Sequence, residues 1–251
     1  MTGPAHQLDP LDHVASLRTE VGRCADLVAT GDLEAPIEHC PGWTVRQLVL
    51  HLGGVHRWAL TAATTGTQPA SRGDLPESDS AADLSAWLRR GGDALAAVLG
   101  ELDPDAPTWH PFPVPHRAAV WPRRQAMETM VHRWDLEHAL GTETALDPAL
   151  ASDGIDEYFE MMLPRRLSRD ELAGPTTSLH VHCTDVPGEW LARYEGDRLL
   201  VTREHAKGDA ALRGPAAAIF LALWGRTSGA SGSEIIGDQA AASEWLALGG
   251  V

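Results

Sequence analysis

The stretch that decides the fold is residues 43–58, WTVRQLVLHLGGVHRW, because it combines a helix start with a helical spacing of apolar residues. Thr44 can cap a helix here and Gln47 can reach back to it, which is the pattern of a capping box. Apolar residues then recur every three or four positions, at Val45, Leu48, Val49, Leu52 and Val55. The sequence therefore predicts an amphipathic helix that reaches about Thr65.

The same spacing on both sides of this stretch predicts three more helices. We expect them at about residues 11–30, 81–102 and 122–141. Pro122 favours a first helical turn, and Gly141 favours a C-terminal stop. The proline-rich residues 103–115 cannot be helical and predict a long loop. Four helices with one apolar face each indicate a four-helix bundle.

The pattern changes after about residue 145, where one connecting helix is expected over residues 147–169. Short apolar runs then predict strands. These strands are expected at residues 179–183, 190–194, 199–202 and 210–213, with helices at 215–224 and 239–248. The predicted fold class is therefore α followed by α+β. It comprises a four-helix bundle domain at residues 1–150 and a small α+β domain at 151–251.

The composition excludes several classes of function. With 35 acidic and 20 basic residues, the formal net charge of -15 repels phosphate backbones and anionic lipid, so no nucleic-acid or membrane partner is expected. No apolar run approaches the roughly 18 residues of a membrane span. Residues 1–10 lack the basic and apolar regions of a signal peptide. Three scattered cysteines do not form a disulfide framework. We therefore expect a soluble, cytoplasmic protein.

The helix expected over residues 122–141 carries side chains that could perform chemistry. Glu128, His132 and Asp135 are spaced by four and three residues, so they share one narrow stripe. The oxygen and nitrogen donors of Glu128 and His132 suit Zn²⁺ or another divalent first-row metal. Asp135 could orient the His132 ring, as metal-bound imidazoles usually require. Ordinary exposed Glu/His pairs have the same spacing, and Asp135 could equally form a surface salt bridge, so spacing alone does not establish a site.

A third ligand would have to come from another helix. His51 and His56 both lie towards the edges of the apolar stripe in the helix that follows Thr44, and projection does not choose between them. Two glycines between them, Gly53 and Gly54, cost on the order of 2 kcal/mol relative to alanines. Close approach by another helix or by a ligand would each explain this cost.

Two further histidines, His180 and His182, point to the same side of an expected strand. Such a pair can bind a metal, but solvent-facing positions on a half-buried strand are the more common arrangement. The sequence therefore predicts that both side chains face solvent.

Three segments of the sequence resemble one known family. They are residues 40–52 (CPGWTVRQLVLHL) followed by 55–58 (VHRW), residues 128–137 (ETMVHRWDLE), and residues 212–226 (LRGPAAAIFLALWGR). Together they resemble the mycothiol-dependent maleylpyruvate isomerase family. That family belongs to the DinB-like metal-binding bundles, and its C-terminal α+β domain is similar to sterol-carrier folds. The resemblance covers most of the chain and implies the same order of domains.

The resemblance implies a specific set of site residues. In the family, a histidine of the first signature and a glutamate and histidine of the second hold a divalent metal, commonly zinc. The matching residues are His51, Glu128 and His132, which favours His51 over His56. The family's C-terminal domain also contributes an arginine, and Arg226 is the candidate catalytic residue because it ends the third segment. Mycothiol is the implied thiol cosubstrate.

The implied function is an enzyme, a metal- and mycothiol-dependent isomerase or S-transferase that acts on a small electrophilic substrate. Two histidines and one glutamate leave open coordination positions on zinc. A thiol that binds there loses its proton more readily. Two alternatives stay open: a thiol-independent metal-dependent hydrolase or lyase, and a non-catalytic metal- or ligand-binding protein. The substrate and the oligomeric state are not readable from the sequence.

Overall fold

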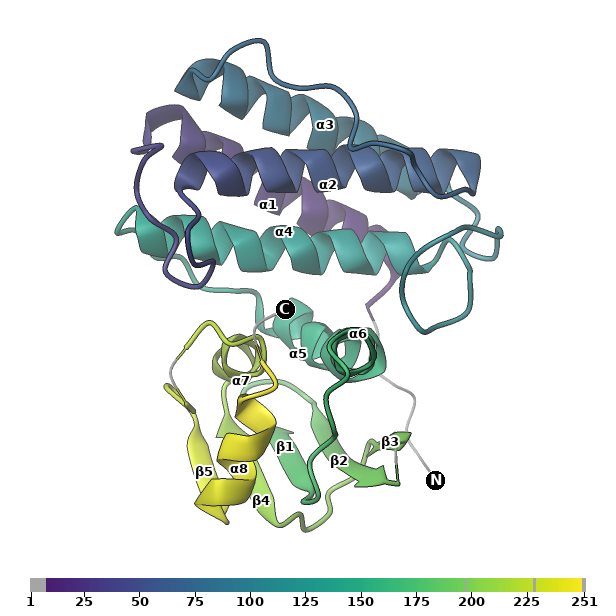
Figure 1. Cartoon of the computed structure of the whole chain (residues 1–251), viewed down its shortest axis with the longest axis vertical. Coiled ribbons are helices and arrows are strands. Elements are labelled where there is room, and N and C mark those ends of the chain that lie inside the picture. The colour runs from purple at the N-terminus through teal and green to yellow at the C-terminus, as the bar shows by residue number, and fades with distance from the viewer. Residues whose placement is uncertain (1–7, 197, 228, 250–251) are drawn as a thin grey trace. The chain divides into compact units, whose positions relative to one another are not determined.

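The helix that begins after Thr44 is α2 (Val45–Thr65), one of four long helices in the described part of the computed structural model (Figure 1). The other three are α1 (Pro10–Thr30), α3 (Ala81–Glu101) and α4 (Val120–Ala139). At the start of α2, the Gln47 side-chain oxygen accepts the backbone N–H of Thr44 at 2.6 Å, which confirms the expected helix start. At its end, Gly66 has a φ of 68°, a left-handed conformation that glycine adopts without strain.

The structure describes residues 8–196, 198–227 and 229–249. Residues 1–7, which include most of the segment that argues against a signal peptide, lie outside this description. The chain divides into two compact units, Asp9–Pro111 with Pro115–Thr144, and the residues from 145 onward with Phe112–Val114. Within the described ranges, every helix is too short or too polar to cross a bilayer.

The first unit is the expected four-helix bundle. Helices α1 and α2 each pack against both α3 and α4. Part of the bundle core is formed by the buried apolar side chains of Cys24, Val28, Leu48, Leu52, Leu84, Trp87, Leu88 and Leu136. At Gly53, a Cβ atom would lie only 2.1 Å from the Trp87 ring, so close approach of α3 explains this glycine. At Gly54, the nearest side chain is instead that of Arg72, at 3.2 Å.

Replacing Gly53 by alanine should destabilise the bundle even though alanine is the better helix former. The new methyl group would overlap the Trp87 ring, and overpacking of a core typically costs about 1–3 kcal/mol. Urea unfolding followed by circular dichroism measures this loss. Gly100→Ala is the matched control, because its Cβ would meet only Val14, at 3.9 Å, and should leave stability equal or higher. Equal midpoints for the two variants would contradict the prediction.

The single helix expected over residues 147–169 is interrupted. The structure contains α5 (Pro148–Glu157) and α6 (Leu163–Arg169), joined by a π-helical turn (Tyr158–Met162). Pro164 explains the interruption, because proline has no backbone N–H and its ring clashes with the carbonyl four residues earlier. The wider π-helical turn accommodates this conflict while the chain stays helical.

The second unit contains a five-stranded mixed sheet in the order β3-β2-β1-β4-β5 (Figure 1). Its strands are β1 (Leu179–Cys183), β2 (Glu189–Glu195), β3 (Arg198–Thr202), β4 (Ala210–Gly214) and β5 (Glu234–Gly237). β1 and β4 are parallel, and the other neighbours are antiparallel. β5 was not expected from the sequence, because this short edge strand is mostly exposed and lacks a buried alternation.

One face of the sheet is buried and the other is an outer face. Helices α7 (Ala216–Leu223) and α8 (Gln239–Leu246) contact β1 and β4. On β1, Leu179, Val181 and Cys183 are buried, and His180 and His182 point to the opposite face, as strand alternation requires. His182 is half-buried, but His180 is only 7% exposed. The prediction that both histidines face solvent is therefore wrong for His180.

Candidate metal centre

Helices α2 and α4 bring three of the expected side chains together. The Oε1 atom of Glu128 lies 3.2 Å from Nε2 of His51 and 3.4 Å from Nε2 of His132. The rings of the two histidines are edge to face, with centroids 5.3 Å apart. His51 comes from α2, and the other two residues come from successive turns of α4, as the i,i+4 spacing predicts.

The three donor atoms fit a divalent metal. In a tetrahedral zinc site with bonds of about 2.05 Å, neighbouring donor atoms are about 3.3 Å apart. The distances from Oε1 of Glu128 to the two histidine nitrogens, 3.2 and 3.4 Å, are close to this value. Two imidazole nitrogens and one carboxylate oxygen are ligands that zinc accepts in catalytic sites. The His51 side chain is 24% exposed, whereas that of His132 is 8% exposed, so solvent reaches the group on the His51 side.

Arg124 supports the carboxylate of Glu128 from one turn earlier in α4. Its Nη2 atom donates to Oε2 of Glu128 at 2.6 Å, which leaves Oε1 directed at the two histidines. Burial acts to raise the pKa of Glu128, but Arg124 and hydrogen bonds from both histidines outweigh it and hold the pKa well below its usual range. The carboxylate is therefore ionised, as a ligand must be. Sequence reasoning missed Arg124, although its i−4 position from Glu128 was a readable signal.

Asp135 fixes the orientation of His132. Its Oδ2 atom lies 2.9 Å from Nδ1 of His132 and accepts a hydrogen bond from the proton on that nitrogen, so the ring is held with Nε2 facing Glu128. Burial acts to lower the pKa of His132, but hydrogen bonds to Asp135 and Glu128 and the charges of both carboxylates raise it overall. A carboxylate behind the ring is the arrangement that metal-bound histidines commonly have.

Arg72, on the loop between α2 and α3, contacts the other ligand histidine. Its Nη1 atom lies 3.2 Å from Nδ1 of His51. An arginine can only donate, so this contact requires a lone pair on Nδ1 and a proton on Nε2. Metal binding through Nε2 of His51 would move the proton to Nδ1 and would displace the exposed Arg72 side chain. Nothing in the sequence pattern pointed to this residue.

The remaining histidine of α2, His56, lies in the bundle interior and outside the donor group. Its Nε2 atom lies 2.9 Å from Oγ1 of Thr129, and the side chain is fully buried. Burial lowers the pKa of His56 to about 3, so the ring stays neutral. Its position agrees with the choice of His51 that the family resemblance implied.

Cys40 precedes α2 and lies near His132 and Asp135. Its sulfur, a nitrogen of His132 and an oxygen of Asp135 are within 4.8 Å of one another. This set uses Asp135, which already holds Nδ1 of His132, so the group around Glu128 is the better candidate. None of the three cysteines, all of which are described, is in a disulfide.

Arg226, the expected catalytic arginine, belongs to the second unit. It follows the C-terminal end of α7 and is 2% exposed. Its Nη1 atom donates to the carbonyl of Trp224 at 3.0 Å.

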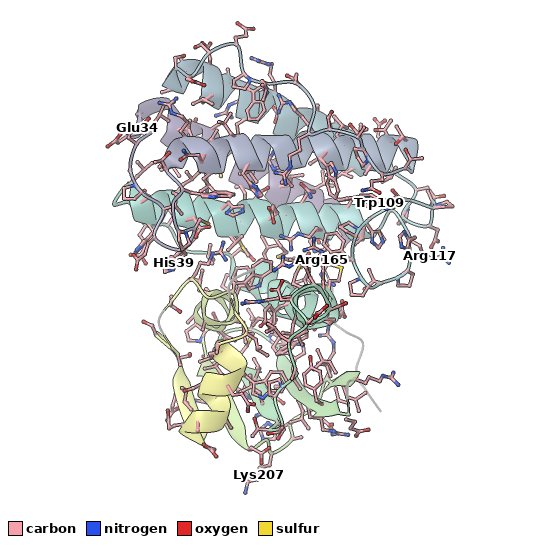
Figure 2. The ribbon with its side chains drawn as sticks, in the orientation of Figure 1. Glu34, His39, Trp109, Arg117, Arg165 and Lys207 are labelled. Atoms are coloured by element: carbon pink, nitrogen blue, oxygen red, sulfur yellow. The ribbon has the colours of Figure 1, made fainter. Side chains whose placement is uncertain are left out.

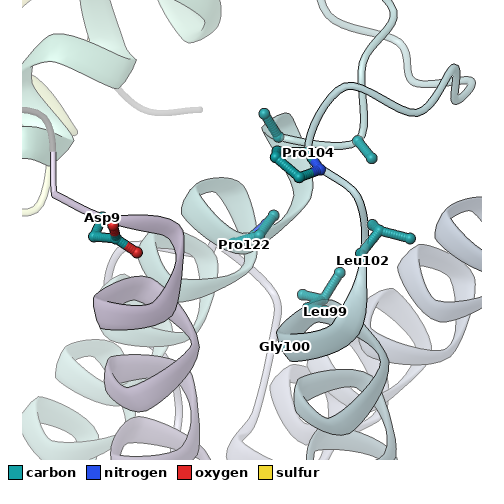
Figure 3. Close-up of a pocket in the computed structure, with 8 residues that line it drawn as sticks. Asp9, Leu99, Gly100, Leu102, Pro104 and Pro122 are labelled. Atoms are coloured by element: carbon teal, nitrogen blue, oxygen red, sulfur yellow. The ribbon is translucent and has the colours of Figure 1, made fainter.

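Two surface cavities contain none of the expected site residues. The cavity in Figure 3 has a volume of about 280 Å³ and lies in the bundle unit between Leu99, Leu102, Pro104 and Pro122, with Asp9 at its edge. The other, of about 460 Å³, is lined by Leu167, Tyr194 and Leu199 in the second unit. The lining of the first is mainly apolar and offers no group of metal ligands.

The fold and the donor set define a two-unit protein, a four-helix bundle that carries a His–Glu–His group, followed by a small mixed sheet. Residues 14–137 match the family described as the mycothiol maleylpyruvate isomerase N-terminal domain, and residues 149–244 match that of the corresponding C-terminal domain. The chain therefore belongs to the mycothiol maleylpyruvate isomerase family, an enzyme family.

Two solved structures share this fold over nearly the whole chain. One is the mycothiol-dependent maleylpyruvate isomerase, with a TM-score of 0.59 and 15% identity, covering 91% of this chain and 93% of that chain. The other is a histidine-to-alanine variant of an enzyme of that name, with a TM-score of 0.60, 13% identity and the same coverage. No curated protein matches the sequence significantly.

Proposed function

We propose that this protein is a metal- and mycothiol-dependent enzyme that isomerises, or transfers the thiol to, a small electrophilic substrate. The observation that carries the proposal is that donor atoms of His51, Glu128 and His132 lie within 4.8 Å of one another in the bundle. Family membership supports the thiol, and the donor chemistry supports zinc or a similar divalent metal. A reduced thiol cosubstrate belongs in a reducing compartment, which favours the cytoplasm.

Each residue of the proposed site would have its own role in binding the metal or the substrate. His51, Glu128 and His132 would hold the metal, which lowers the pKa of a bound thiol and so supplies thiolate near neutral pH. Asp135 would keep Nε2 of His132 available, and Arg124 would keep Glu128 ionised and oriented. Arg226 remains the proposed group for a bidentate contact with a substrate carboxylate.

The chemistry follows from a nucleophilic sulfur and an activated double bond. Attack forms a carbon–sulfur bond and converts the double bond to a single bond, about which the substrate can rotate. Expulsion of the same thiolate restores the double bond in the other geometry, which is cis–trans isomerisation. If the adduct is instead protonated and released, the product is a thioether, which is S-transfer.

Turnover should require both metal and thiol. The test combines metal analysis of the purified protein with a screen of unsaturated acids and other electrophiles, with and without mycothiol, read by chromatography and mass spectrometry. We expect stoichiometric metal at the bundle group and product only when thiol is present. Isomer without net thiol consumption indicates an isomerase, and a thioether indicates a transferase. Turnover that is undiminished without thiol would contradict the proposal and favour a hydrolase or lyase.

A further inference from the structure

A second group of metal-type side chains lies on the outer face of the sheet, within the C-terminal unit. His180 and His182 belong to β1, Glu189 opens β2, and His205 lies on the loop between β3 and β4. His182 and Glu189 are direct partners in the antiparallel register, so their side chains share one face. The loop that carries His205 also carries Lys207, which is labelled in Figure 2.

The donor atoms of this group are close together. Oε1 of Glu189 lies 2.5 Å from Nδ1 of His182 and 3.1 Å from Nδ1 of His205. The ring of His180 lies edge to face with that of His205, with centroids 5.3 Å apart. One ligand atom from each of the four residues lies within 4.8 Å of the other three.

Hydrogen bonding to Glu189 accounts for only part of this arrangement. It explains His182 and His205, which share one carboxylate oxygen, but it leaves His180 unexplained. Nε2 of His180 is buried and has no hydrogen-bond partner in the described structure. A buried imidazole nitrogen without a hydrogen-bond partner costs stability, which a ligand at this position would recover.

We propose that His180, His182, Glu189 and His205 form a second binding site for a divalent metal of the zinc class. Three imidazole nitrogens and one carboxylate oxygen complete a tetrahedral shell without water, which is typical of structural rather than catalytic zinc. Donors up to 4.8 Å apart must approach to about 3.3 Å in such a shell. His205 can make this movement, because its side chain is 78% exposed and lies on a loop.

The consequence of binding is a link between three parts of the second unit. A bound ion would join β1, the start of β2 and the loop between β3 and β4. It would hold this loop over the outer face of the sheet, at a site separate from the bundle group. The proposal does not depend on the function proposed above, because the two groups share no residue.

Zinc stoichiometry of the full-length protein tests the second site. The protein is stripped with a chelator and titrated with Zn²⁺ in a calorimeter, and Co²⁺ absorption then reports the geometry. We expect two equivalents and a tetrahedral cobalt spectrum. His182→Ala and His205→Ala should each lower the affinity for one equivalent of zinc at least tenfold. Binding of the other equivalent should be unchanged. His51→Ala should remove the equivalent that these two variants retain.

A control variant and a folding check separate loss of the second site from a general effect of mutation. His116→Ala removes an exposed imidazole that belongs to neither group and should still bind two equivalents. Circular dichroism checks folding, and His205→Ala carries little risk because its side chain is exposed. Unchanged binding in both His182→Ala and His205→Ala overturns the second site. If His51→Ala changes nothing while His205→Ala removes an equivalent, the second site is supported and the bundle centre fails.

Discussion

Replacing Glu128 by glutamine should weaken zinc binding to the bundle more than 100-fold and abolish thiol-dependent turnover. The change keeps the size of the side chain but exchanges the ionised oxygen between His51 and His132 for a neutral amide. It also removes the carboxylate that Arg124 holds at 2.6 Å. Removal of a residue that only supports a metal ligand usually lowers metal affinity about 10–100-fold, so removal of a ligand should lower it more. Zinc titration and assays with mycothiol measure the two effects.

Two comparisons separate ligation from general disturbance. Asp135→Asn should reduce zinc affinity by only about 10–100-fold, because it alters the group that orients His132 and leaves all three donors in place. Glu101→Gln, an exposed change at the end of α3, should alter neither affinity nor turnover. If Glu128→Gln retained stoichiometric, tight zinc at the bundle, Glu128 would not be a ligand and the proposed centre would be wrong.

The helices of the bundle could be predicted because their signals are local. The spacing of apolar residues places each helix, and residues such as Thr44 and Gly66 mark where α2 begins and ends. The edge strand β5 and the π-helical turn could not be predicted in the same way. β5 depends on its pairing with β4, which is distant in the sequence. The π-helical turn follows from Pro164, a single residue that opposes the helical pattern of the apolar residues around it.

The site could be predicted only in part for a similar reason. Glu128, His132 and Asp135 share a stripe on one helix, so their spacing alone brings them together. The choice between His51 and His56 depends on how α2 is rotated against α4, and spacing within α2 carries no information about that rotation. The family resemblance favoured His51, whose Nε2 lies 3.2 Å from Glu128, whereas His56 contacts Thr129.

The interior of α4 was the least predictable part of the bundle. Eight of its polar residues are buried: Arg123, Arg124, Gln125, Thr129, His132, Arg133, Asp135 and Glu137. A helical projection assigns such polar residues to an exposed face, because it uses one helix alone and contains no information about partners on other helices. Arg133 is an example of such a buried residue, because its partner Glu20 lies in α1, 113 residues away in the sequence.

Replacing Arg133 by methionine should lower the free energy of unfolding of the bundle by about 3–5 kcal/mol, the usual cost of breaking a buried ion pair. The guanidinium is fully buried and donates to Glu20 through Nε and to Glu137 through Nη1, the latter at 2.6 Å. Thr144 completes the group, with its hydroxyl 2.6 Å from Oε1 of Glu137. Without Arg133, buried Glu137 loses its arginine partner, and buried Glu20 keeps only Arg23, at 3.5 Å. Urea unfolding of the bundle, followed by circular dichroism, measures the loss.

The charge origin of this loss predicts both a pH dependence and a rescue. Burial already raises the pKa of Glu20, although Arg133 opposes that shift, so removal of Arg133 should raise it further. A carboxyl whose pKa is higher in the folded state favours folding as pH falls, so the penalty should be largest at neutral pH and shrink towards pH ~4. The triple variant Glu20→Leu, Arg133→Met, Glu137→Leu should regain most of the stability, because apolar groups of similar volume can replace a buried ion group. A penalty that is independent of pH and persists in the triple variant would show that Arg133 acts through packing instead of charge.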